Sequence, residues 1–297
     1  DLSSNPDAEA VKLLKENPTK IDWAQLTENP APEAIEIFKK YPKQIKKYWK
    51  ELHQNPTSTA IEILKQNPNN IVWHLIYNNS HMLSSSAIKL LIQNLDKIES
   101  WSILSDKLAF NPAPEAIELL KQNPAEISWY NLSKNPSQAA IEFLKQNPEE
   151  IDWWGLSSNP SNAAMELIKQ KLNQNFDTEE IDWMSLTLNQ TPTAIELFQK
   201  YQIYINWGML SANPKAIELL EKNQNKINWT LLSSNPAPGA IQLLRQNPSK
   251  IDNYELSANP GAIDLLKQYP EKIIWYQLSE NPAIFKSYKI ANGVHKT

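Results

Sequence analysis

Apolar and polar positions follow a helical rhythm along most of the chain. In the stretch NPAPEAIELLKQ, residues 111–122, the apolar side chains fall at Ala116, Ile117, Leu119 and Leu120. This spacing forms one stripe on a helix of 3.6 residues per turn, and it does not alternate as the residues of a half-buried strand do. The pattern therefore predicts an amphipathic helix with one buried face.

The ends of this first helix are marked by Asn and Pro. Proline suits the first turn of a helix, where its missing N–H is not needed, and we expect the preceding asparagine to be the N-cap. A second Asn-Pro pair, Asn123 and Pro124, ends the helix, because proline cannot continue it. The residues that follow predict a turn.

A second, shorter helix is predicted after each turn. In ISWYNLS, residues 127–133, Ser128 precedes Trp129, and with Ser128 as N-cap the side chains of Ile127 and Leu132 form a hydrophobic staple. A helix of about two turns is marginal alone, so we expect stacking to hold it in place. The residue at this capping position is Asp22, Ser100, Ser128, Asp152, Asp182, Asn206, Asn228 or, where the tryptophan is lost, Asp252.

This helix pair recurs as a tandem repeat. Eleven full repeats, most of 22 to 26 residues, start at Asn5, Asn29, Asn55, Asn79, Asn111, Asn135, Asn159, Asn189, Asn213, Asn235 and Asn259, with a partial one from Asn281. Each pair is too small to bury its apolar face except against its neighbours. The sequence therefore predicts an all-α fold, an α-solenoid of about eleven helix–turn–helix repeats that runs as one array through residues 1–297.

Charge and composition narrow the functional classes. The net charge is −4, whereas a nucleic-acid binder usually carries a basic balance, so nucleic acid is not the expected partner. The chain has no cysteine, which excludes disulfides and Cys-containing metal sites and favours a reducing compartment. No run approaches the roughly 18 apolar residues of a membrane span, and we expect none.

The combined pattern resembles tandem-repeat proteins of large nucleocytoplasmic DNA viruses, of the mimivirus and algal-virus kind. Residues 213–220, NPKAIELL, and residues 227–229, INW, carry the resemblance most clearly, and it covers nearly the whole chain. The resemblance implies a viral structural or host-interaction protein, located in the host cytoplasm or in the virion. It assigns no activity to individual residues.

Tryptophan, asparagine and glutamate recur along the array, and each allows a functional and a structural interpretation. The tryptophans, most of them at one fixed place in the repeat, could form an aromatic ladder that grips a ligand. Equally, they could pack at the joint between repeats with the indole N–H bonded to a carbonyl. The asparagines could contact a partner backbone or serve only capping and turns. Repeated glutamates of the first helix alternate with lysines and predict a solvated, mixed surface.

The clearest local departure from the repeat is a basic segment at residues 39–50, KKYPKQIKKYWK. Lysines interleaved with aromatic residues could bind phosphates, anionic lipid or nucleic acid. A drifted repeat with a solvated face would look the same. The candidate binding residues are Lys39, Lys40, Lys43, Lys46, Lys47, Tyr48, Trp49 and Lys50.

Catalytic signatures are missing from the sequence. The four histidines lack the spacing of a helical zinc site, and no nucleophile elbow, phosphate-binding loop or EF-hand loop occurs. We therefore expect no enzyme activity, cofactor or metal. The favoured hypothesis is a non-enzymatic scaffold for protein–protein interaction. The alternatives are a self-associating structural component of a viral particle or fibre and, more weakly, a helical-repeat nucleic-acid binder.

Overall fold

The computed structural model describes residues 2–78, 83–174 and 178–287, which form 23 α-helices and 13 short 3₁₀ helices. Because these ranges contain no β-strand, the protein is all-α, as the sequence predicted. The chain comprises two compact units, Asp1–Asp152 and Trp153–Thr297. The start at Asn79 lies outside the described residues, and a single continuous solenoid stays a prediction.

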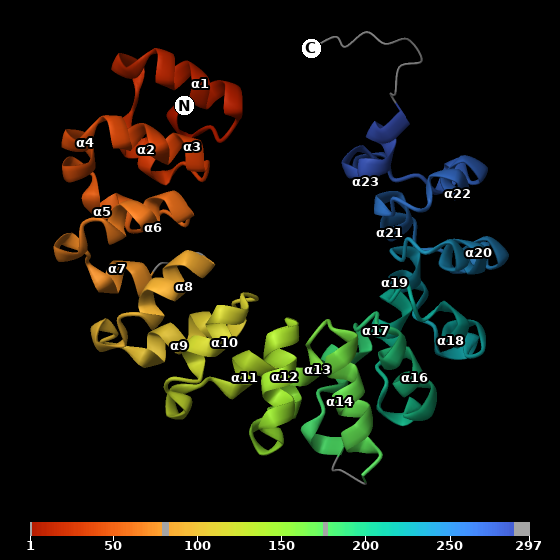
Figure 1. Ribbon diagram of the computed structural model, residues 1–297. Coiled ribbons are helices and arrows are strands. Elements are labelled where there is room, and N and C mark those ends of the chain that lie inside the picture. Colours follow the sequence, from red (N-terminus) through yellow and green to blue (C-terminus); the bar gives the residue numbers. More distant parts are fainter. Residues whose placement is uncertain (1, 79–82, 175–177, 288–297) are drawn as a thin grey trace. The chain divides into compact units, whose positions relative to one another are not determined.

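In the unit Asp1–Asp152, the helices form two layers (Figure 1). The first helices of successive repeats contact one another in chain order, and the second helices lie against them. The first helices are α1 (Ala8–Glu16), α3 (Pro32–Glu36), α6 (Ser58–Lys65), α8 (Ser85–Ile92), α10 (Pro114–Leu120) and α12 (Gln138–Gln146). The second helices are α2 (Trp23–Glu28), α4 (Pro42–Lys47) with α5 (Trp49–Leu52), α7 (Trp73–Tyr77), α9 (Trp101–Phe110) and α11 (Trp129–Ser133).

The unit Trp153–Thr297 repeats this arrangement. Its second helices contact one another in chain order from α13 to α23, and each first helix lies beside the second helix that precedes it (Figure 1). The first helices are α14 (Asn162–Leu172), α16 (Pro192–Lys200), α18 (Ile217–Glu221), α20 (Pro238–Gln246) and α22 (Ile263–Gln268). The second helices are α13 (Trp153–Ser157), α15 (Trp183–Thr187), α17 (Trp207–Ala212), α19 (Trp229–Ser233), α21 (Asn253–Ala258) and α23 (Trp275–Glu280).

Most of the predicted turns contain a single turn of 3₁₀ helix. At Asn147 the side-chain Nδ2 donates to the Phe143 carbonyl at 2.8 Å, which satisfies a carbonyl at the end of α12, and Pro148 then begins the 3₁₀ turn. The 3₁₀ helices are η1 (Leu2–Ser4), η2 (Pro18–Lys20), η3 (Ile37–Lys40), η4 (Pro68–Asn70), η5 (Leu95–Lys97), η6 (Pro124–Glu126), η7 (Pro148–Glu150), η8 (Thr178–Glu180), η9 (Gln202–Tyr204), η10 (Gln224–Lys226), η11 (Pro248–Lys250), η12 (Pro270–Lys272) and η13 (Pro282–Ser287).

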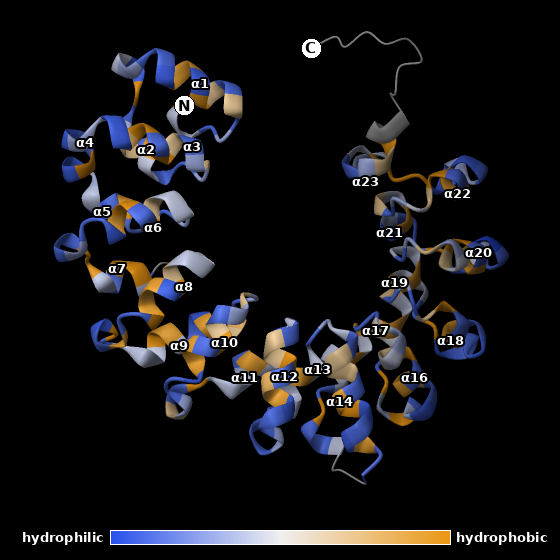
Figure 2. Ribbon diagram, viewed as in Figure 1, coloured by the Kyte–Doolittle hydropathy of each residue, from blue (hydrophilic) through white to orange (hydrophobic). Residues whose placement is uncertain are grey.

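The core lies between the layers and consists of the predicted stripe. Ala116, Ile117, Leu119 and Leu120 of α10 are all buried, and the leucine three residues after the tryptophan, such as Leu132, is fully buried. Figure 2 shows apolar and polar positions side by side on the helices, as expected where each buries only one face. The repeated glutamates and lysines lie outside this core, as predicted, and some of them form the ion pairs Lys39–Glu36, Lys65–Glu62, Lys121–Glu118 and Lys145–Glu142.

The predicted caps of the second helices are confirmed at Asp22 and at four further Asp or Asn positions. Asp22 Oδ1 accepts hydrogen bonds from the backbone N–H groups of Ala24 and Gln25 at 3.1 and 3.2 Å. Asp182, Asn206, Asn228 and Asp252 cap in the same way. Ser100 and Ser128 occupy the same position without a side-chain capping hydrogen bond.

The asparagine that begins each repeat is not the N-cap that the sequence predicted. Helix α12 has Ser137 as its N-cap, and Ser137 Oγ accepts from the Ala140 N–H at 3.3 Å. Asn135 Oδ1 accepts instead from the backbone N–H of Ser137 at 2.9 Å, which closes an Asx turn. The predicted turn chemistry is therefore present, while the capping belongs to a residue two positions later.

Within each unit, the same asparagine bonds to the backbone of the preceding repeat at most of the described positions, so that successive asparagines form a ladder. Asn213 Nδ2 donates to the carbonyls of Thr187 and Asn189 at 3.0 and 2.9 Å, and Asn189 begins the preceding repeat. Asn213 is buried and extended, and the proline after it favours that backbone. Bonds of this kind are made by Asn29, Asn55, Asn111, Asn135, Asn189, Asn235, Asn259 and Asn281.

A hydroxyl four residues after the tryptophan makes a second joint. Ser233 Oγ donates to the Trp229 carbonyl at 2.8 Å and accepts from the backbone N–H of Asp252, in the next repeat, at 3.0 Å. Ser233 is fully buried. Both joints thus pair a polar side chain of one repeat with the backbone of its neighbour. The equivalent bond is accepted by Ser3, Ser105, Ser133, Ser157, Ser211 and Ser257.

Candidate binding groove

Most of the tryptophans at the fixed place are half-buried, which favours packing over a ladder open to ligand. The Trp183 ring stacks on Tyr204 with centroids 4.9 Å apart, and Trp183 Nε1 donates to the Thr178 carbonyl at 3.0 Å. Trp275, also at the fixed place, and the extra tryptophan Trp154 are exposed instead. The repeated aromatic position is therefore mainly structural, and exposed aromatic surface is confined to particular repeats.

The basic segment at residues 39–50 forms η3, α4 and α5, and the structure separates its eight candidate residues. Lys39 pairs with Glu36 at 2.7 Å, and its hydrogen bond lowers the pKa of that carboxyl. Lys40 lines a cavity that also contains Glu36. The Lys47 ammonium lies 4.9 Å from the centre of the Tyr48 ring. Lys39, Lys47 and Tyr48 thus interact within their own repeat, and Lys40 lines a separate cavity.

Lys46 and Trp49 line a groove of about 780 Å³, here named the Lys46–Trp49 groove. Its first wall consists of Pro42, Ile45, Lys46 and Trp49, whose spacing places them on one face across α4 and the start of α5. Lys43 and Lys50, the remaining candidates, are exposed to solvent and do not belong to this lining. The structure therefore brings two of the eight residues together in one concave site.

The second wall of the Lys46–Trp49 groove is the turn that opens the second half of the next repeat. It contributes Asn67, Asn69, Asn70, Ile71 and Val72, none of which is charged. Lys46 is therefore the only charged residue in the lining. The groove combines an apolar surface, amide groups and a single positive charge.

The aromatic rings of the basic segment are engaged within the protein. Trp49 Nε1 donates to the Asn70 carbonyl at 2.5 Å, and its ring meets the His53 ring edge-on with centroids 5.8 Å apart. Tyr41 packs against Trp23 at 5.0 Å. Binding of single-stranded nucleic acid relies on aromatic faces that are open to bases. These contacts argue against base stacking at this segment.

His53, behind the groove, replaces the serine of the repeat joint. Its Nδ1 lies 2.7 Å from the Trp49 carbonyl, and its Nε2 accepts the backbone N–H of Val72 at 2.8 Å. These partners require the neutral ring with its proton on Nδ1. His53 is 2% exposed, and burial lowers its pKa from the ordinary value.

We expect His53 to make stability depend on pH. Its pKa in the folded protein lies below that of the unfolded chain, about 6.5, so the unfolded chain binds the proton more readily. Stability should therefore be full above about pH 6.5 and fall as the pH drops towards the folded-state pKa. The variant His53→Ser restores the usual joint residue and should flatten this part of the profile, measured as urea midpoint against pH. Identical profiles for the two proteins would contradict the assignment.

Sequence reasoning missed His53 and the second wall, although both leave a signal in the repeat. His53 stands where most other repeats have Ser or Thr, and Val72 stands where most of them have Asp, Asn or Ser. A substitution that breaks an internal pattern is visible without a structure. What the sequence does not show is that these two positions meet the basic segment of the preceding helices.

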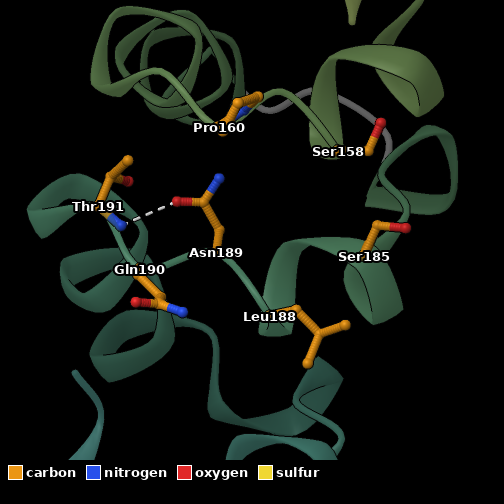
Figure 3. Close-up of a pocket in the computed structure, with 7 residues that line it drawn as sticks. All are labelled: Ser158, Pro160, Ser185, Leu188, Asn189, Gln190 and Thr191. Carbon is orange, nitrogen blue, oxygen red and sulfur yellow. Dashed lines mark hydrogen bonds between the residues drawn. The ribbon is translucent and has the colours of Figure 1, made fainter. Parts of the chain in front are cut away.

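A second concave site lies in the unit Trp153–Thr297 (Figure 3). It has a volume of about 520 Å³ and lies beside the turn in which Asn189 Oδ1 accepts from the Thr191 N–H at 2.9 Å. Its hydroxyl and amide groups can donate and accept hydrogen bonds, but it contains no ionisable side chain that could act as a general base. The lining residues are Ser158, Pro160, Ser185, Leu188, Asn189, Gln190 and Thr191.

Residues 2–78, 83–174 and 178–287 provide neither a metal site nor a membrane span. Within them, no three residues of the His, Cys, Asp and Glu types are grouped so that they could hold a metal ion. The helices in those ranges are too short or too polar to span a lipid bilayer. The Lys46–Trp49 groove is therefore the candidate site with the most distinctive chemistry.

Comparison of the chain with protein families, with curated proteins and with solved structures gives no match. The functional argument therefore depends on the geometry of the repeats and of the two concave sites.

Proposed function

We propose that this protein is a non-enzymatic scaffold that binds segments of other proteins along its second-helix layer. The observation that carries the proposal is the residue after the tryptophan, which is exposed in most repeats and differs in kind from one repeat to the next. The joints between repeats, by contrast, use the same asparagine and hydroxyl bonds at most of the described positions. A constant frame with a variable exposed position is typical of repeat proteins that recognise extended partners.

The exposed side chains at this position include large apolar ones. Tyr130, Trp154, Met184, Tyr254 and Tyr276 are between 44% and 70% exposed. Tyrosine, tryptophan and methionine are enriched at protein interfaces because they supply large contact areas at a modest entropic cost. Exposed side chains of these types at equivalent positions favour a protein partner over a small molecule.

Equivalent positions on contacting helices form a row. In the unit Trp153–Thr297, α19 and α21 are in contact, and Thr230, the residue after the tryptophan on α19, donates its hydroxyl to Asp252 Oδ2 at 3.3 Å. Tyr254, two residues after Asp252 on α21, occupies the position equivalent to Thr230. A segment that crosses these helices would therefore meet the variable residue of each repeat in turn.

Peptide selection tests this proposal. Peptides from a random phage-displayed library, enriched on the wild-type protein, should bind the triple variant Trp154→Ala, Met184→Ala and Tyr254→Ala at least about tenfold more weakly, since interface anchors of this kind carry most of the binding free energy. The matched control is Ile203→Ala, which removes an exposed apolar side chain that lies in η9 instead of a second helix.

Equal binding by the triple variant and the wild type, or the absence of any enriched peptide, would contradict the proposal. Ordered oligomers that grow with protein concentration and exclude peptide would favour the alternative of a self-associating structural component. Sedimentation velocity at several concentrations measures this directly. The melting temperature of each variant shows that the fold is retained.

A further inference from the structure

The Lys46–Trp49 groove has an uncompensated positive charge. Lys46 forms no ion pair with any residue that the structure describes, and the same holds for Lys43 and Lys50 on the same helices. Glu51 is the one acidic residue of α4 and α5, and it is not part of the groove lining. The groove therefore favours an anionic ligand.

The opposite wall lacks the carboxylate that several other repeats have at the equivalent position. Asp22, Asp182 and Asp252 hold the position before the second helix in their repeats, whereas this repeat has Val72. Val72 is 36% exposed and caps no N–H group of α7 with its side chain. The exchange removes a negative charge that would repel an anion and adds apolar surface that a ligand can cover.

The remaining lining chemistry favours a peptide among anionic ligands. Ile45, Ile71 and Val72 offer apolar contacts, while the side-chain amides of Asn69 and Asn70 have no partner among the described residues and are free to pair with a peptide backbone. The volume lies within the range of sites that hold a few side chains. The engaged aromatic rings leave no stacking platform for bases.

We propose that the Lys46–Trp49 groove binds an acidic segment of a partner protein, with an apolar side chain of that segment against Ile45 and Val72 and its carboxylates towards Lys46. The inference rests on the proposed function and deepens it by naming the class of partner at one repeat. Association should be faster and tighter at low salt, because the lysines that attract the segment are exposed to solvent.

The test uses a fluorescein-labelled peptide of alternating Glu and Leu, with a Gln and Leu peptide of equal length as the neutral reference. Fluorescence anisotropy should show that wild-type protein binds the acidic peptide and not the neutral one. Lys46→Glu should weaken binding by about tenfold or more, since it turns attraction into repulsion. The control Lys250→Glu makes the same change of net charge at an exposed position where other repeats already have Glu126 and Glu150, and it should bind like wild type.

A second variant separates binding from folding. Val72→Asp introduces the residue that Asp22, Asp182 and Asp252 provide in their repeats, and it should cap the His74 and Leu75 N–H groups as Asp22 caps its helix. We expect its melting temperature to equal or exceed that of the wild type, while binding of the acidic peptide falls by about tenfold or more. Loss of binding without loss of stability assigns the effect to the groove.

Three outcomes would overturn the inference. One is equal binding of the acidic peptide by wild type, Lys46→Glu and Val72→Asp; another is no binding to wild type at low salt. The third is tighter binding of single-stranded DNA or phosphatidylserine vesicles with the same sensitivity to Lys46→Glu, which would assign the groove to another anion. The library experiment above uses residues of other repeats, so either proposal can fail without the other.

Discussion

Replacement of Asn213 by alanine should lower the free energy of unfolding by roughly 2–5 kcal/mol, because each buried polar group left unpaired costs about 1–3 kcal/mol. The amide of Asn213 donates to the carbonyls of Thr187 and Asn189 and accepts from the backbone N–H of Lys215, at 2.9 to 3.0 Å. Alanine can form none of these three hydrogen bonds. Urea unfolding followed by far-ultraviolet circular dichroism measures the loss.

The matched control is Asn225→Ala, which removes the same amide from an exposed position of the same repeat. It should change stability by less than about 0.5 kcal/mol, as surface substitutions usually do. Asn213→Asp sharpens the test, because it keeps the shape and places carboxylate oxygens against two carbonyls. It should be at least as damaging as alanine at neutral pH. Similar unfolding midpoints for the Asn213 variants and the control would refute the ladder as a source of stability.

The second large effect is expected at the leucine three residues after the tryptophan. Leu232→Ala should cost about 3 kcal/mol, since the side chain is fully buried between the layers and its removal leaves a cavity. The neighbouring residue Leu231 is only partly buried, and Leu231→Ala should cost about 1 kcal/mol or less. The pair differs in burial alone, on the same helix α19. Equal losses of unfolding free energy in the two variants would contradict the assignment of Leu232 to the core.

Helix positions were predictable because they depend on local pattern. The stripe of Ala116, Ile117, Leu119 and Leu120, the burial of Ile127 and Leu132 and the capping role of Asp22 all follow from spacing within one repeat. The sequence therefore predicted the all-α fold and its buried positions. Periodicity and capping carry this information without knowledge of neighbouring repeats.

The role of the starting asparagines was not predictable in the same way. An asparagine before a helix predicts an N-cap or a turn, and the Asx turn at Asn135 agrees with the second of these roles. Its second function, donation to carbonyls of the preceding repeat, depends on the distance between repeats, which composition and spacing do not give. Only the regularity of Asn through every repeat hinted at more than local chemistry.

The candidate site was half predictable. The excess of lysine over acidic residues at residues 39–50 indicated the segment that forms one wall of the groove. The sequence did not show which of the eight candidate residues line it. Whether a lysine meets a carboxylate, an aromatic face or solvent depends on packing. Lys39 has Glu36, Lys47 has the Tyr48 ring, and Lys46 alone faces the groove.

The asparagine ladder has a consequence for how such a chain can change length. The acceptors of the described asparagines, such as the two of Asn259, are backbone carbonyls, which every residue type provides, so the bond makes no demand on the side chains of the neighbouring repeat. Duplication, deletion or transplantation of a whole repeat therefore regenerates the same linkage at the new junction. Gene segments that encode single repeats are, in this sense, interchangeable parts, and exposed residues can diversify while the connection stays the same.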